Sequence, residues 1–269
     1  MRDQRTAHDA TTVADDLQVL DDVLLDTPAT DVTRRRLLRV AAMGAASAGA
    51  LGVTGASGVT AIAGAATAES PLEILSTLAT AESFGVTFLT EAVRRAPGTP
   101  SAGLVDTLRA ANTAEFDHVV ALRRLGGRQK TLRFWIPEAA FGGGGVGLFE
   151  SIETADTLEL MGYLTGVTAF AKRGQERAAR FLAEGCAVES EHRAIARFAQ
   201  TALGGRQQIS IDRSFAPWSV RTVGAMIRGL ERAGIGFGKQ GAAPGRFYVF
   251  PGDPVANGSG LRNNGRRPA

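Results

Sequence analysis

The sequence predicts an all-α fold, a bundle of four helices made of two antiparallel helix hairpins joined by a long crossover. Three observations lead to this prediction. Four long segments between residues 71 and 203 have the composition and apolar spacing of helices. Stretches rich in glycine or proline separate these segments. A Glu-x-x-His motif occurs in the second segment and again in the fourth, so the second hairpin repeats the first.

The composition supports a folded helical protein. Of the 269 residues, 44% are hydrophobic and 21% are charged, and alanine and glycine are abundant, as expected where helices pack closely. The net charge is +3, and without residues 1–68 there remain 24 basic and 19 acidic residues. This mild, scattered excess does not indicate a nucleic-acid partner. Cys186 is the only cysteine, which excludes an intramolecular disulfide and a cysteine-based zinc site.

The first 68 residues read as an export signal. The run 33–39 (TRRRLLR) precedes an uncharged stretch from residue 40 to residue 68 and resembles a twin-arginine signal. Small-x-small sites stand at 61–63 and 66–68, and we expect cleavage after Ala68. The uncharged stretch could instead span a membrane, but its many small and polar residues make transfer into lipid weakly favourable.

The signal implies a location and a partner. We expect export by the twin-arginine machinery to the periplasm, the cell envelope or the exterior, with membrane attachment only if the signal stays uncleaved. The acidic segment 9–31 is then a polar leader outside the fold. The chain divides into a leader and signal peptide (1–68), a helical bundle (69–205) and a C-terminal extension (206–269).

The first hairpin is predicted from local signals. Ser70-Pro71 provides a cap and a first-turn proline, and the helix runs to about Arg95. Residues 96–101 form a turn rich in proline and glycine. The second helix extends from about residue 102 to residue 125 and is stopped by two glycines.

The second hairpin follows a long connection. Residues 126–145 end in four glycines, and we expect this crossover to be non-helical. Helices follow at about 146–172 and 175–203. The extension contains one further predicted helix, 219–233, and then an irregular end with three prolines. We expect residues 257–269 to be disordered.

Six polar residues obey the duplication. The two Glu-x-x-His motifs lie 74 residues apart, and an acidic residue precedes the glutamate of each motif by 33 residues. Of the three histidines in the chain, one lies in the leader and the other two lie in these motifs. The six candidate ligands are Glu82, Glu115, His118, Asp156, Glu189 and His192.

The spacing indicates a metal centre. Residues three apart share one face of a helix, so each motif presents a carboxylate and an imidazole to the same point. Four carboxylates and two imidazoles form the ligand set of di-iron and di-manganese bundles. Without metal, this many buried carboxylates would repel one another. The plainer interpretation, a solvated polar face, fits a single Glu-x-x-His better than two in register.

Some neighbouring side chains stay open at this stage. Glu153 and Glu159 lie three residues to either side of Asp156, and either could replace this shorter side chain or lie on the surface. Tyr163 could hydrogen-bond a ligand or donate an electron, although plain core packing is the simpler role. Glu191 and Asp117, next to the motif residues, are expected to point elsewhere.

The residues 72–203 resemble ferritin-like domain proteins related to rubrerythrins and plant desiccation-related proteins. The resemblance is carried by residues 74–82, by 115–122 (EFDHVVAL) with the following LGG, and by 189–192 (ESEH). The family's ligand pattern maps onto five of the six candidates, all except Asp156. The family usually has glutamate at that position. The cysteine pair of a rubredoxin-type iron centre is also missing.

The resemblance implies a cofactor and two hypotheses for function. The cofactor would be two iron ions, or manganese in their place. One hypothesis is an oxidoreductase or ferroxidase acting on iron, oxygen or peroxide. The alternative is a non-catalytic exported metal-binding or stress-protection bundle, and a bundle without metal that serves as an interaction module is a third possibility. Homo-oligomers are possible, although a ferritin cage is not expected with this crossover and tail.

Overall fold

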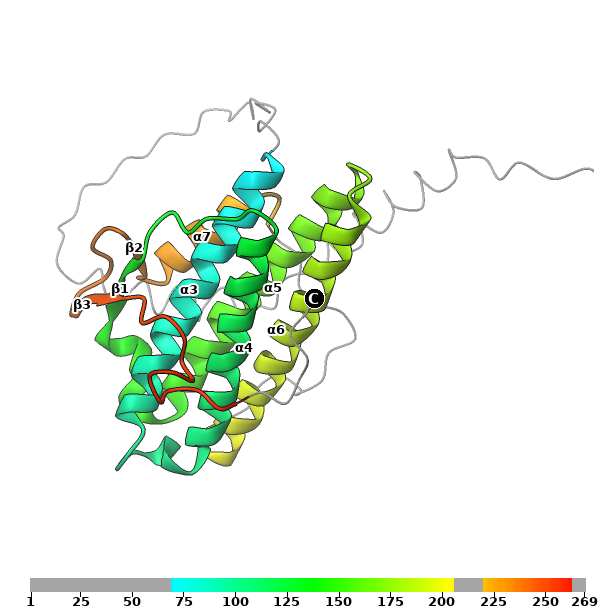
Figure 1. Cartoon of the computed structure of the whole chain (residues 1–269). Helices are drawn as coiled ribbons and strands as arrows, with labels where there is room; N and C mark the ends of the chain where they lie inside the picture. Colours follow the sequence, from blue (N-terminus) through cyan, green and yellow to red (C-terminus); the bar gives the residue numbers. More distant parts are fainter. Residues whose placement is uncertain (1–68, 206–219, 263–269) are drawn as a thin grey trace, which may run out of the picture. The chain divides into compact units, whose positions relative to one another are not determined.

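The computed structural model describes residues 69–205 and 220–262 (Figure 1). The predicted leader, export signal and cleavage site lie outside the described residues. The same is true of the segment 206–219 and of residues 263–269.

The first long helix, α3 (Pro71–Arg95), begins where the sequence places it. The side chain of Ser70 accepts a hydrogen bond from the Glu73 amide, and the Glu73 carboxylate accepts one from the Ser70 amide, a complete capping box. Most of the helix is buried on all sides. By length and composition α3 could cross a membrane, but here its apolar surface is covered by the other helices of the bundle.

Four long helices form two hairpins, as predicted. A short 3₁₀ helix, η1 (Pro100–Leu104), leads into α4 (Val105–Arg124), which packs against α3. The second hairpin consists of α5 (Val146–Ala171) and α6 (Glu176–Ala202). The helices lie side by side in Figure 1, and their bounds fall within three residues of the predicted ones. The structure is therefore mostly helical and compatible with the predicted bundle.

The all-α prediction is wrong in one respect, because a small antiparallel sheet lies beside the bundle. Strand β1 (Arg133–Pro137) pairs with β2 (Gly236–Phe237) on one side and with β3 (Gly245–Val249) on the other. Phe134 and Ile136 of β1 are fully buried in the core. Each strand is too short to show a clear alternation, and the partners of β1 lie about a hundred residues away in sequence, so local patterns do not reveal them.

The crossover also contains a helical element where a non-helical segment was expected. A 3₁₀ helix, η2 (Glu138–Gly144), precedes α5 directly. Gly142 has a φ of 48°, and a Cβ at this position would lie 2.4 Å from the backbone of Gly147. Only glycine permits this close approach of the turn to the start of α5. The glycine run therefore forms a tight turn into the helix.

The C-terminal extension is part of the same core. The predicted fifth helix is present as α7 (Val223–Arg232), which packs mainly on α5. Met226 and Leu230 are buried among the residues of the bundle. The Glu69 carboxylate accepts hydrogen bonds of 2.7 Å from the first two amides of α7 and so anchors its N-terminus.

The prediction of disorder is wrong for residues 257–262. The Asn112 side chain on α4 donates to the carbonyl of Ser259 at 3.0 Å, and the amide of Leu261 donates to the hydroxyl of Thr113 at 3.1 Å. Small polar residues suggested a solvated end, but polar side chains of α4 bind this backbone. We name residues 253–262 the C-terminal strap.

Candidate metal centre

The structure brings all six predicted residues together in the interior of the bundle. Each of the four long helices contributes, so that both hairpins meet at the same point. The potential ligand atoms form two groups, and within each group all atoms lie within 4.8 Å of one another. The first group is Glu82, Glu115, His118 and Glu189, and the second is Glu115, Asp156, Glu189 and His192.

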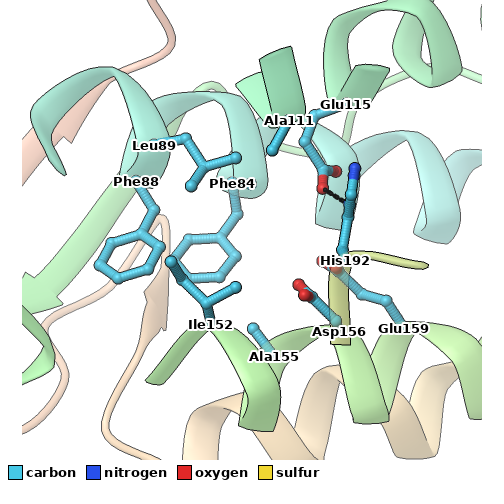
Figure 2. A pocket seen from close by; sticks show the side chains of 11 residues that line it. Phe84, Phe88, Leu89, Ala111, Glu115, Ile152, Ala155, Asp156, Glu159 and His192 are labelled. Carbon is cyan, nitrogen blue, oxygen red and sulfur yellow. Dashed lines mark ion pairs between the residues drawn. The ribbon is translucent and has the colours of Figure 1, made fainter. Parts of the chain in front are cut away.

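The two groups share Glu115 and Glu189, the glutamates of the two motifs. Each imidazole contacts the glutamate of the other hairpin. Nδ1 of His118 lies 3.2 Å from Oε1 of Glu189. Nδ1 of His192 lies 3.2 Å from Oε1 of Glu115, the ion pair drawn as a dashed line in Figure 2. His118 also lies 3.2 Å from Oε2 of Glu82. The two hairpins, which repeat each other in sequence, therefore meet in an approximately symmetric way: the histidine of each motif lies beside the glutamate of the other.

The carboxylates are removed from water. Glu82 and Glu189 have no exposed surface, and Asp156, the most exposed of the acidic ligands, is only 5% accessible. Within the described residues, Oε2 of Glu115 and Oδ2 of Asp156 have no hydrogen-bond partner. Because an unpartnered buried carboxylate oxygen is energetically costly, these atoms favour a bound cation as their partner.

The electrostatics of the cluster are those of closely packed acids. Burial, followed by the charges of Glu189 and of Glu82, raises the pKa of Glu115 well above its usual range. Burial and the charge of Glu189 likewise raise the pKa of Asp156. Burial also raises the pKa of Glu189, but the close approach of both imidazoles outweighs it and lowers that pKa to about 2.

Burial has the opposite effect on the two imidazoles. Burial lowers the pKa of His118, but the charge of Glu82 and contacts with Glu189 outweigh it and raise that pKa well above its usual range. The pKa of His192 is raised against its burial by Glu115 and Glu189. Without metal, protonated imidazoles therefore balance part of the acidic charge, and a metal ion would have to replace those protons.

The structure distinguishes the two alternatives to Asp156. Glu159 is buried, 1% accessible, and its Oε1 has no hydrogen-bond partner within the described part of the chain. Burial and the charge of Glu115 raise its pKa well above the usual range. Glu153 instead accepts hydrogen bonds from Arg197 at 2.9 Å and from Gln200 at 2.8 Å. Glu159 thus lies buried beside the cluster, outside the two groups of potential ligands, whereas Glu153 is engaged in a separate network.

Tyr163 is in contact with the cluster as well as with the core. Its ring is fully buried, its hydroxyl donates a hydrogen bond to Oε1 of Glu82, and the ring meets His118 edge-on with centroids 5.9 Å apart. A Cβ on Gly185 of α6 would lie 2.8 Å from the tyrosine ring, so glycine makes room for it. The spacing of four residues from Glu159 was the only sequence signal for this contact.

The two other neighbours of the motifs lie apart. Glu191 is exposed to solvent and Asp117 is only partly buried. Neither belongs to either group of potential ligands. The prediction that these side chains point away from the shared face is consistent with this arrangement.

A small cavity lies against the cluster. Its volume is about 20 Å³, enough for one water-sized molecule. Figure 2 shows Phe84, Phe88, Leu89 and Ile152 on one side and the polar residues Glu115, Asp156, Glu159 and His192 on the other. The site therefore combines an apolar wall, which excludes water, with a cluster of charged groups.

The donor set fits divalent transition metals. Carboxylate oxygens and imidazole nitrogens suit iron and manganese, and unpartnered oxygens are present in the cluster. The two groups of four potential ligands share two carboxylates, and each group could hold a metal ion.

Comparison with protein-family models, with curated protein sequences and with solved structures finds no match for this chain.

Proposed function

We propose that this chain is an exported ferritin-like protein that holds two metal ions, iron with manganese as the alternative, and acts as an oxidoreductase on iron, oxygen or peroxide. One observation carries the proposal: two groups of potential ligands, each confined within 4.8 Å, overlap in Glu115 and Glu189. A single ion would not need two such groups. Two ions would need shared carboxylates to offset their mutual repulsion.

The residues divide into roles. Glu82 and His118 would hold one ion, Asp156 and His192 would hold the other, and the shared glutamates would contact both. Glu159 adds a carboxylate near the shorter side chain of Asp156.

Once bound, the two ions would supply redox equivalents and polarise a small oxidant. The chain's own side chains do the rest. Tyr163 holds one oxygen of Glu82 and so orients the other toward His118. The phenylalanine-lined cavity excludes bulk water and limits the site to molecules about the size of water. These features favour a small oxidant over a bulky organic substrate.

A second function, metal binding without turnover, is favoured by the same enclosure. A site whose cavity measures about 20 Å³ is hard for larger molecules to reach. The bound ions would then stabilise the native bundle by binding it and not the unfolded chain. Oxidation of ferrous ions or consumption of peroxide by the loaded protein separates the two functions, since a structural centre would show neither.

Metal content tests the proposal first. We expect about two iron or manganese ions per full-length chain by elemental analysis after reconstitution. Glu115→Gln/Glu189→Gln should lose both ions, because both positions depend on the shared glutamates. Glu191→Gln is the matched control, since this neighbouring carboxylate is exposed and outside the cluster. Circular dichroism shows whether each variant remains helical.

The outcomes are distinct. Loss of metal in the double variant alone, with helicity kept, supports a dinuclear centre. Absence of metal from the folded wild-type protein after reconstitution with either ion would sink the proposal. One ion per chain would contradict the dinuclear arrangement.

Export is a separate part of the proposal and rests on the arginine run and the uncharged stretch after it. Arg34→Lys/Arg35→Lys should retain the protein in the cytoplasm, as read by cell fractionation, because the paired arginines are the recognised feature of the signal. Normal export of this variant would remove the twin-arginine route from the proposal without affecting the metal centre.

A further inference from the structure

A groove between α4 and α6 lies outside the metal cluster. It has a volume of about 390 Å³. Two opposing helix faces line it: Ala121, Arg124 and Leu125 of α4, and Arg177, Arg180, Phe181 and Glu184 of α6. On each helix these residues lie within two turns at spacings of one, three, four or seven, so each set occupies one side of its helix.

The charge of the groove is positive. Three arginines line it and only one carboxylate does, that of Glu184, which pairs with Arg180 at 3.0 Å. Arg124 also has an interaction within the protein. Arg177 has no hydrogen bond or ion pair within the described residues. It also lies in the first turn of α6, where the helix dipole favours an anion. The groove is therefore complementary to negative charge.

The floor of the groove is apolar. Ala121 is buried, and Leu125 and Phe181 are partly buried and pack against the hydrophobic core. Arginines at the edge of a groove whose lining includes a phenyl ring and a leucine side chain suit a ligand with an acidic group on an apolar body. A free divalent cation would be repelled by the arginines.

The groove lies between the same two helices, α4 and α6, that meet at the metal centre. His118 of α4 faces Glu189 of α6, and Ala121 lies three residues beyond His118 on the same helix. Because α4 and α6 are antiparallel here, Glu184 and Phe181 lie on the corresponding side of Glu189. A molecule in the groove is about one helical turn from the edge of the cluster.

We propose that this groove binds a small organic anion, with a phosphate or carboxylate held by Arg124, Arg177 and Arg180 and an apolar body packed on Phe181 and Leu125. The inference goes beyond the metal centre, because none of these residues is a candidate ligand. It gives the chain a second binding site of opposite charge preference. An anionic co-substrate or effector would be recognised there.

The test is isothermal titration calorimetry on the full chain without added metal, using phenyl phosphate and inorganic phosphate as probes. Wild-type protein should bind phenyl phosphate more tightly than phosphate, because only the former has a ring to pack on the apolar floor. Arg177→Gln/Arg180→Gln should weaken binding by about tenfold or more, since two charge-assisted contacts are removed. Both side chains are exposed, so folding should be unaffected.

Arg232→Gln is the control for lost charge, because this arginine is exposed on α7. Equal weakening in the control and in the double variant would overturn the proposal, as it would show a non-specific charge effect. Failure of both probes to bind, or no preference for phenyl phosphate, would also overturn it. So would binding of phosphatidylglycerol vesicles without binding of phenyl phosphate, which would indicate a membrane surface instead. These measurements do not depend on metal content. The groove can therefore fail this test while the proposed metal centre holds, and the metal centre can fail its own test while the groove binds the anion.

Discussion

A substitution at Gly85 should disturb the geometry of the metal centre and leave the stability of the bundle nearly unchanged. It lies in the interior of α3, where a Cβ would come 2.8 Å from Oε2 of Glu115 and 3.1 Å from the carbon of the same carboxylate. Ordinary contact begins at 3.4 Å, so in Gly85→Ala the oxygen must move by about 0.6 Å. The atoms that must move are the flexible end of a side chain and not backbone.

Gly85→Ala should favour folding of the helix and weaken metal binding. Alanine in place of glycine in a helix interior favours folding by about 1 kcal/mol, which offsets much of the cost of moving the carboxylate. Ligand distances in metal sites fall within about 0.2 Å of their usual values, so a shift of about 0.6 Å should weaken metal binding. We expect a loss of about 10-fold to 100-fold in affinity, as for other changes that misplace a ligand.

The assay compares two measurements on the same protein. Thermal unfolding of the metal-free form should change little, whereas competition with a chelator should show the weakened metal binding. Gly103→Ala is the control, because a Cβ there has nothing within 4 Å. If Gly85→Ala bound two ions with wild-type affinity, the position of Glu115 would not matter and its assignment as a shared ligand would be wrong.

Three further predictions concern other sites. Hydrogen bonds from two arginines outweigh burial and lower the pKa of Glu91 from 4.5 to about 2. The stabilisation is therefore present above pH 4.5 and is lost as the pH falls toward 2. The stabilisation should amount to roughly 1–2 kcal/mol at neutral pH once solvent screening is allowed for. Glu91→Gln should therefore flatten the acid side of a plot of unfolding free energy against pH, and an unchanged plot would contradict this. Glu159→Gln should weaken metal binding at unchanged helicity, whereas Glu153→Gln should lower stability in urea with metal content intact. The reverse pattern would show that the roles of these two residues are wrongly assigned. Asn112→Ala should cost about 1–3 kcal/mol in urea unfolding, because its buried amide holds the C-terminal strap, and a loss below about 0.5 kcal/mol would show that the strap adds little.

The sequence by itself determined the helices and the six-residue cluster. Helix signals are local: the cap at Ser70, the glycine stops and the apolar spacing each act within a few residues. The duplication then placed the two Glu-x-x-His motifs in equivalent helices, and the structure brings their side chains together. Packing of four helices leaves few positions where such residues can meet.

The tertiary structure alone decided which acidic neighbours join the cluster. Glu153 and Glu159 are each about 60° around the helix from Asp156, so the sequence treats them alike. The residues packed against α5 break this symmetry: Arg197 binds Glu153, whereas Glu159 lines the same cavity as Glu115 and Asp156.

The sheet, the strap and the groove were equally beyond the sequence pattern. Strand β1 finds its partners in β2 and β3 about a hundred residues later, and the strap binds α4 from a still greater distance along the chain. The arginines of the groove come from two helices that are separated in sequence by α5. Contacts of this kind depend on how distant segments pack, and no periodicity within either segment encodes them.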